Sequence, residues 1–218
     1  MEPDFWHRRW EQNQIGFHEH EFNAHMTRFI RHLGVQPGDR LLVPLCGKSL
    51  DMLWLAQQGF EVTGIEISPI AVEAFFQEND LEPERTTQAD TLVYQAGSIS
   101  IICADFFSVA PEQLPAIDGV YDRASLIALP PEMLPDYVTQ LTKLSGPAAG
   151  SLLITLDYPP EEMQGPPFSI DPDRVRELFQ QHYRVEQIYQ EDCLAESHFR
   201  NKGLTRLYEH VFALSRRV

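Results

Sequence analysis

Residues 40–66 read RLLVPLCGKSLDMLWLAQQGFEVTGIE, and this stretch predicts a strand, a turn, a helix and a second strand. The apolar run Arg40–Leu45 is typical of a buried strand, and Phe60–Glu66 is a second such run after an amphipathic stretch. Ser49 is expected to cap the helix between them, and Gly59 is expected to end it. Alternation of strands and helices favours a parallel sheet that is covered by helices.

The same alternation continues toward the carboxyl terminus. Further strands are expected as a hairpin at 91–103 and at 119–122, 150–157, 183–190 and 204–214, with helices opening at Pro69, Pro131 and Pro172. No helix separates the last two strands, so the final strand is expected to run antiparallel. The sequence therefore predicts an α/β fold with a mostly parallel sheet and helices on both faces. Ligands of such sheets bind outside the carboxyl ends of the strands.

Residues 1–34 are expected to form a helical extension in front of this core. Apolar side chains fall on one helical face of residues 20–33, and Gly34 follows as a stop signal. The α/β core then spans residues 40–214. Residues 1–218 are expected to form a single domain, since the length suits one sizeable core.

Composition limits the partners of this chain. It has 218 residues and a formal net charge of -15 at pH 7, which argues against nucleic acid and anionic membranes, because both favour clustered Lys and Arg. Three cysteines without CxxC spacing are typical of reduced thiols, and the sequence shows neither a spanning apolar run nor a secretory leader. We expect a soluble cytoplasmic protein that acts on a small molecule, monomeric because no interface pattern is visible.

The segment LCGKS at residues 45–49 partly matches a phosphate-binding P-loop. The motif GxxxxGK[ST] needs an earlier glycine so that backbone N–H groups can curl around a phosphate. Leu42 occupies that position, and Pro44 has no N–H group to donate. The dinucleotide motif GxGxxG is also absent. A P-loop-like nucleotide phosphotransferase is therefore kept only as an alternative.

Three charged residues follow expected strands at the edge where ligands bind. Glu66 comes 19 positions after Gly47, about the spacing at which an acid meets a ribose diol in nucleotide-binding sites. The alternative interpretation is that Glu66 binds no ligand and is an ordinary exposed glutamate beyond a strand. Asp105 follows the strand ISIIC and is either an acceptor for an adenine amino group or a loop cap. Arg123 follows GVYD and is either part of the chemistry or a surface ion pair.

The amino-terminal part of the chain is rich in histidine and tryptophan. None of the standard metal-ligand spacings occurs, so a non-catalytic metal-binding module is a second alternative and no metal is expected. Trp6 and Trp10 lie four residues apart and would share a helix face. They would pack in the core or cover a cationic ligand. The histidines are His7, His18, His20, His25 and His32.

Four segments together resemble the thiopurine S-methyltransferase family. They are VPLCGKSLDMLWLAQQGFEVTGIEIS at 43–68, WHRRW at 6–10, YDRAS at 121–125 and QGPPF at 164–168, and the resemblance runs from Trp6 to about Leu214. It implies a Rossmann-like class I methyltransferase fold with a seven-stranded sheet. It also implies methyl transfer from S-adenosylmethionine (SAM) to the sulfur of thiopurines and other aromatic or heterocyclic thiols, giving S-adenosylhomocysteine. Several bacterial members of the family are associated with methylation of selenium or tellurium compounds, so these compounds are further candidate acceptors.

The resemblance also implies roles for particular residues. Arg123 is the expected catalytic residue, and Phe17 stands where the family covers its substrate pocket. The second basic group of the acceptor site is either His198 or Arg200. The residues expected to bind SAM are Trp10, Leu45, Glu66 and Arg123, with Trp6 close by and Asp105 and Phe106 as the pair that contacts adenine.

Overall fold

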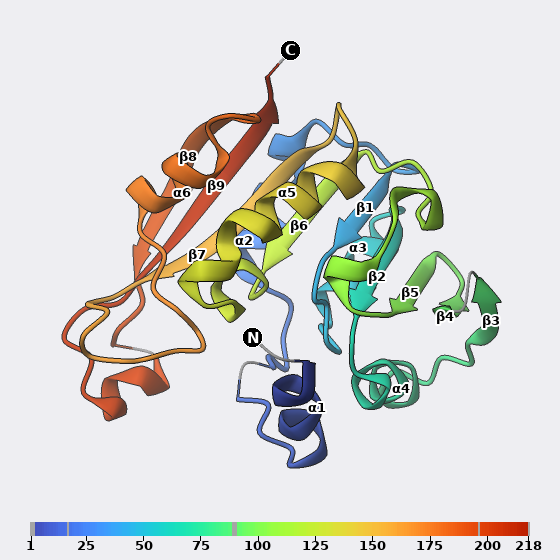
Figure 1. The fold of residues 1–218 in the computed structure, drawn as a ribbon, viewed down its shortest axis with the longest axis horizontal. Helices are drawn as coiled ribbons and strands as arrows, with labels where there is room; N and C mark the ends of the chain where they lie inside the picture. Colours follow the sequence, from blue (N-terminus) through green and yellow to red (C-terminus); the bar gives the residue numbers. More distant parts are fainter. Residues whose placement is uncertain (1–2, 17, 89–90, 196, 218) are drawn as a thin grey trace.

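The computed structural model describes residues 3–16, 18–88, 91–195 and 197–217, and within these ranges a nine-stranded sheet forms the centre of the fold (Figure 1). Its order is β3-β4-β5-β2-β1-β6-β7-β9-β8. The strands are β1 (Arg40–Val43), β2 (Glu61–Glu66), β3 (Glu84–Gln88), β4 (Thr91–Ala96), β5 (Ile99–Cys103), β6 (Gly119–Arg123), β7 (Gly150–Asp157), β8 (Tyr183–Asp192) and β9 (Tyr208–Arg216).

The expected count of seven strands is too low. Seven strands lie in the order β5-β2-β1-β6-β7-β9-β8, and they are parallel as expected apart from β9, which runs antiparallel to both of its neighbours, also as expected. β4 and β3 extend it by pairing antiparallel beyond β5. β3 reads ERTTQ and all five residues are exposed, so it carries no apolar alternation by which the sequence could reveal it.

Helices cover both faces of the sheet, as predicted. α5 and α6 pack on one face and α2, α3 and α4 on the other (Figure 1). β1 shows why both faces are apolar, because Leu42 packs toward α5 while Leu41 and Val43 pack toward α2 and α3. The helices are α1 (Pro3–Glu11), α2 (Ala24–Phe29), α3 (Asp51–Gln57), α4 (Pro69–Glu78), α5 (Leu134–Ser145) and α6 (Pro172–Phe179), with 3-10 turns η1 (Ile30–Leu33), η2 (Phe106–Ser108), η3 (Pro111–Gln113), η4 (Leu126–Ala128), η5 (Pro131–Met133) and η6 (His198–Lys202).

Capping residues set where the helices begin. Ser68 accepts a hydrogen bond from Ala71 N with Pro69 as the next residue, and Asp171 caps α6 in the same way, as predicted for both. The predicted cap at Ser49 is wrong by one residue, because Leu50 occupies the cap position of α3. Ser49 Oγ instead accepts from Asp51 N at 3.3 Å, so its hydroxyl remains at the end of the turn.

The expected amino-terminal extension consists of two parts. α1 lies beyond the carboxyl ends of β1, β2 and β6 (Figure 1). α2 and η1 instead pack against the sheet, with Met26 and Ile30 almost fully buried, and Asn23 rather than residue 20 begins the helix. Within the described ranges, no helix is long and apolar enough to cross a membrane.

Candidate active site

Glu66 lies at the carboxyl end of β2 and is buried, with 5% of its surface exposed. Its Oε2 accepts a hydrogen bond from Gly47 N at 2.9 Å and its Oε1 accepts one from Ser68 N at 2.7 Å. Burial raises the pKa of this carboxyl to about 7, although these backbone donors act to lower it. Each oxygen keeps capacity for a further donor. The alternative of an ordinary exposed glutamate is wrong.

The turn between β1 and α3 has an unusual backbone. Leu45 adopts φ +45 and Gly47 adopts φ +52, and only the second is a glycine. A left-handed conformation at a leucine is strained, and such strain gathers at functional sites. Cys46 N donates to Ile65 O at 3.0 Å, which ties the turn to β2. Leu45 is therefore held half-buried beside the end of β2.

Trp10 on α1 closes over this turn. A Cβ added to Gly47 would lie 3.2 Å from Trp10 Cζ2, so the indole packs directly against the backbone of Gly47. Trp10 is only 7% exposed, whereas Trp6, one turn earlier, is half-buried and meets Phe5 edge to face. The structure thus brings together Trp10, Gly47 and Glu66.

Arg123 lies at the carboxyl end of β6 and is held on all sides. Its Nε donates to Asp51 Oδ2 at 2.9 Å, and its Nη2 donates to Ser49 Oγ at 3.3 Å. Its Nη1 lies 3.1 Å from Glu19 Oε1, which belongs to the segment between α1 and α2. With 12% of its side chain exposed, Arg123 is not the surface ion pair that the sequence left open.

Asp51 is the anchor of this arginine. It is 1% exposed, and its carboxylate also accepts from the Tyr121 hydroxyl and from Asn23 N, both at 2.8 Å. Three donors therefore satisfy a buried charge, as a buried carboxylate requires. The pairing of Asp51 with Arg123 was not predicted from the sequence, although Asp51 stands within the segment LCGKSLDMLWLA that carries the resemblance.

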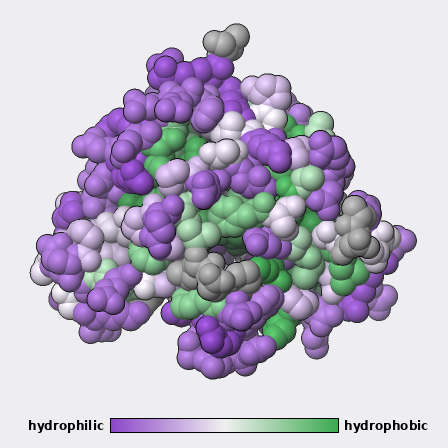
Figure 2. All heavy atoms as spheres, in the orientation of Figure 1, coloured by the Kyte–Doolittle hydropathy of each residue, from purple (hydrophilic) through white to green (hydrophobic). Residues whose placement is uncertain are grey.

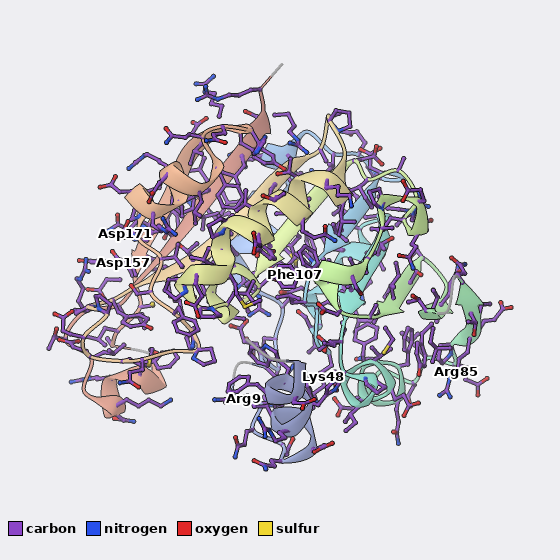
Figure 3. All side chains as sticks on the ribbon, viewed as in Figure 1. Arg9, Lys48, Arg85, Phe107, Asp157 and Asp171 are labelled. Carbon is purple, nitrogen blue, oxygen red and sulfur yellow. The ribbon has the colours of Figure 1, made fainter. Side chains whose placement is uncertain are left out.

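The end of β5 carries the two residues that are expected to contact adenine. Asp105 caps η2, because its Oδ1 accepts from Phe107 N at 3.0 Å. Phe106 is completely buried and its ring stacks on Tyr137, and its contact with adenine stays a prediction. Phe107 is half-buried, and Figure 3 shows it in the middle of the molecule near the carboxyl ends of the strands. Phe107, not Phe106, has exposed ring surface here.

Two connections near the carboxyl ends of β7 and β8 build an apolar wall, formed by residues 158–170, 193–195 and 197–207. Tyr158, Leu204 and Leu207 are its buried centre, with Met163 and Phe199 packed against them. Figure 2 shows a hydrophobic band near the middle of the face that it draws, with hydrophilic surface around much of it.

Of the residues predicted for the acceptor site, two lie on η6. Arg200 is exposed there, and among the described residues no hydrogen bond or ion pair links it to Arg123. His198 also belongs to η6. Phe17 lies outside the described residues. The second basic group of the acceptor site stays a prediction.

Comparison with known proteins settles the class of the molecule. The family model described as thiopurine S-methyltransferase matches residues 1–217. A thiopurine S-methyltransferase of Pseudomonas fluorescens (strain Pf0-1) is 46% identical over 98% of this chain and 99% of its own length. One from Nitrosospira multiformis is 43% identical over the full length of both. This chain belongs to the thiopurine S-methyltransferase family.

Solved structures agree on the fold of this family member. A Burkholderia thailandensis N1-methyltransferase with bound S-adenosylhomocysteine superposes with a TM-score of 0.64 over 99% of this chain and 87% of its own, at 14% identity. A TehB-like SAM-dependent methyltransferase of Corynebacterium glutamicum gives 0.59 over 99% and 98%, at 12% identity. The Rossmann-like class I fold is confirmed, and the protein is a SAM-dependent methyltransferase.

Membership of a methyltransferase family argues against both alternatives, and the turn between β1 and α3 also differs from a P-loop. The N–H groups of Cys46 and Gly47, which a P-loop would offer to phosphate, donate to Ile65 O and Glu66. Lys48 Nζ lies 2.7 Å from both carboxylate oxygens of Glu78, and Figure 3 shows Lys48 between α1 and α4. No group of three metal-ligating side chains occurs in the described part of the chain.

Proposed function

We propose that this enzyme transfers the methyl group of SAM to the sulfur of thiopurines and other aromatic or heterocyclic thiols, giving S-adenosylhomocysteine. The observation that carries the proposal is the turn between β1 and α3. Gly47 in that turn holds Glu66, and Ser49 at its end holds Arg123. One backbone segment, which follows β1, therefore fixes a carboxylate and a guanidinium on β2 and β6, the two strands that flank β1. The acceptor class comes from the relatives, which are named thiopurine S-methyltransferases.

The residues of the turn fit SAM. Each Glu66 oxygen spends one acceptor position on a backbone N–H, which leaves room for the two hydroxyls of a ribose. Leu45 and Trp10 form apolar walls beside it, and an indole also favours a cationic ligand. Asp105 is the candidate for the adenine amino group. When bound, SAM supplies a methyl group that its positive sulfur has already made electrophilic.

Arg123 is the candidate for the acceptor side. Its guanidinium attracts an anionic sulfur, or hydrogen-bonds a heterocyclic nitrogen. Aromatic and heterocyclic thiols ionise easily, so no strong base is required. The enzyme then has to align the sulfur with the methyl carbon and exclude water. Trp10 and the apolar band of Figure 2 would provide that exclusion.

The test is a ligand and product assay on the purified protein. Thermal unfolding is followed with SAM, ATP and zinc in separate samples, since a ligand that binds the native state raises its stability. Only SAM is expected to raise the melting temperature, and a thiopurine is expected to yield its S-methyl product by mass spectrometry. Stabilisation by ATP alone, or methylation of no thiol in an aryl and heteroaryl panel, would refute the proposal.

The same assay extends to the finer proposals. Selenite and tellurite join the acceptor panel together with glutathione, which supplies the electrons needed to reduce these oxyanions, and volatile methylated products are measured in the headspace. We also propose that the protein works as a monomer in the cytoplasm, in a single domain with α1 as a lid. Its cysteines Cys46, Cys103 and Cys193 are all unpaired thiols, as a reducing compartment would keep them. Sedimentation at working concentration tests the monomer.

A further inference from the structure

Two of the three nitrogens of the Arg123 guanidinium are held by the rigid frame of the site. Nε pairs with Asp51, which is buried and satisfied by two further donors, and Nη2 donates to Ser49. Both partners belong to the turn between β1 and α3 or to the first residue of that helix. The contacts with Asp51 and Ser49 therefore fix the orientation of the Arg123 side chain.

The third nitrogen has a partner of a different kind. Nη1 pairs with Glu19, which comes from the segment between α1 and α2 rather than from the sheet or its turns. The Glu19 side chain is 47% exposed, whereas the Arg123 side chain is 12% exposed. Glu19 therefore covers the solvent side of the guanidinium.

The surroundings of Glu19 oppose its charge. Burial raises the pKa of its carboxyl, and the negative charges of Asp51 and Glu209 act in the same direction, while Arg123 and the Asn23 side chain act to lower it. Half-exposed ion pairs are weak in any case. Of the two carboxylates on Arg123, Glu19 is thus the one that another anion can replace.

We propose that Glu19 is an internal substitute for a substrate anion on Nη1 of Arg123, and that it thereby sets the preference of the enzyme between anionic and neutral acceptors. In the free enzyme Glu19 caps the guanidinium. A thiolate or carboxylate of the substrate takes its place, while a neutral thiol leaves it there. This inference rests on the proposed function, because it assigns the acceptor anion to the same arginine.

Glu19→Gln keeps the shape of the side chain and removes the competing charge. Glu21→Gln is the matched control, because it removes the same charge two residues away on the same exposed segment. Near neutral pH, 4-nitrothiophenol is a thiolate and benzyl mercaptan is a neutral thiol. KM and kcat are measured for both acceptors, and the Kd of SAM is measured by calorimetry.

The expected result for Glu19→Gln is a KM for 4-nitrothiophenol that falls about two- to fivefold, the scale of a half-exposed ion pair. Its kcat, the KM for benzyl mercaptan and the Kd of SAM change by less than about twofold. A lower Kd of SAM with both KM values unchanged would contradict the proposal, because the anion that displaces Glu19 would then be the carboxylate of the donor and not the acceptor.

Three further results would overturn the inference. They are weaker binding of both substrates by Glu19→Gln, no change in any of the five constants, and the same effect from Glu21→Gln. Circular dichroism and thermal unfolding of each variant establish that it is folded. Failure of the wild-type enzyme to methylate either thiol would instead count against the proposed function, and the Kd of 4-nitrothiophenol for the wild type and Glu19→Gln would still test Glu19.

Discussion

Glu66 is directed by two backbone donors yet kept from ionising easily by its burial. The donors come from Gly47 and Ser68, on either side of the carboxyl group, so the side chain cannot turn away from the end of β2. The spacing in the sequence predicted its place, because the distance along a strand–helix–strand unit is nearly constant. It could not predict the burial, which depends on α1 and on the turn that folds over the carboxylate.

The first prediction concerns the pH dependence of SAM binding. With a pKa of about 7 in the folded protein, Glu66 is mostly neutral at about pH 6 and mostly ionised at about pH 8. The carboxylate is the stronger acceptor for ribose hydroxyls and attracts the cationic donor, so the Kd of SAM should fall about tenfold over that range. Calorimetry at several pH values measures it.

Glu66→Gln is the control for this prediction, and its affinity should be weaker and nearly independent of pH. A pH profile equal to that of the wild type would assign the titration to Asp122, whose pKa burial raises to about 6. The stability of the protein depends on pH in the opposite direction from SAM binding. A carboxyl whose pKa is raised by folding stabilises the protein fully below about pH 4.5, and this contribution is lost as the pH rises through about 7.

The second prediction is that Arg123→Ala affects both turnover and stability. Loss of a charge-assisted contact of about 1.5–3 kcal/mol should lower kcat/KM roughly 10- to 200-fold. The same change leaves Asp51 buried without its cation, which should lower the free energy of unfolding by about 3 kcal/mol. Urea denaturation and steady-state kinetics measure the two effects.

Arg123→Lys separates these effects. It keeps a positive charge beside Asp51 but loses the planar guanidinium, whose other two nitrogens contact Ser49 and Glu19. We expect stability close to that of the wild type together with reduced turnover. Full turnover in Arg123→Lys would remove the geometric role of the guanidinium.

At the scale of elements, the turn between β1 and α3 determines the site. The strands and helices around it follow from apolar periodicity and from caps such as Ser68 and Asp171. The sequence did not reveal β3, whose residues are all polar. It predicted a helix that ends before Gly34, but it set the start of that helix near residue 20, whereas α2 begins at Ala24 after its cap Asn23. It also missed Asp51 and Glu19, because side-chain pairs 72 or more positions apart leave no local pattern.

The third prediction concerns Gly47→Ala. Its φ of +52 disfavours a side chain, and a Cβ there would lie 3.2 Å from Trp10. We expect a loss of about 1–2 kcal/mol in the free energy of unfolding and weaker SAM binding, because α1 must shift. Denaturation and calorimetry measure both.

Gly97→Ala is the matched control for this turn. Gly97 has a similar φ of +57, but an added Cβ would meet nothing within 4 Å. It should lose only the backbone contribution of about 1 kcal/mol and bind SAM normally. Equal effects of the two substitutions on SAM binding would contradict the contact between Trp10 and Gly47.

At the scale of the whole molecule, the fold class could be predicted from strand–helix alternation alone, since that alternation is set by burial on both faces of the sheet. The alternation could not predict the number of strands, nor the division of the amino-terminal extension into two parts. α2 and η1 complete the core under β7 and β9, whereas α1 reaches across the carboxyl ends of the strands.

The fourth prediction uses this division. A protein that lacks residues 1–21 keeps Asn23, Met26 and Ile30, so it should fold cooperatively with a slightly lower melting temperature, while its SAM affinity falls strongly. A protein that lacks residues 1–34 loses the buried side chains of α2 and η1 and should be largely unfolded. Circular dichroism and calorimetry distinguish the two, and unchanged SAM affinity in the shorter deletion would contradict a role for α1.

The wall formed by residues 158–170, 193–195 and 197–207 has a consequence for how the enzyme can change. It is built from the last third of the chain, whereas Trp10, Gly47 and Glu66 come from the first third. Exchanging these two loops with those of a relative should therefore transplant acceptor preference while leaving methyl-donor recognition in place. The order of these parts along the chain thus allows new methyl acceptors to arise by local replacement rather than by redesign of the entire enzyme.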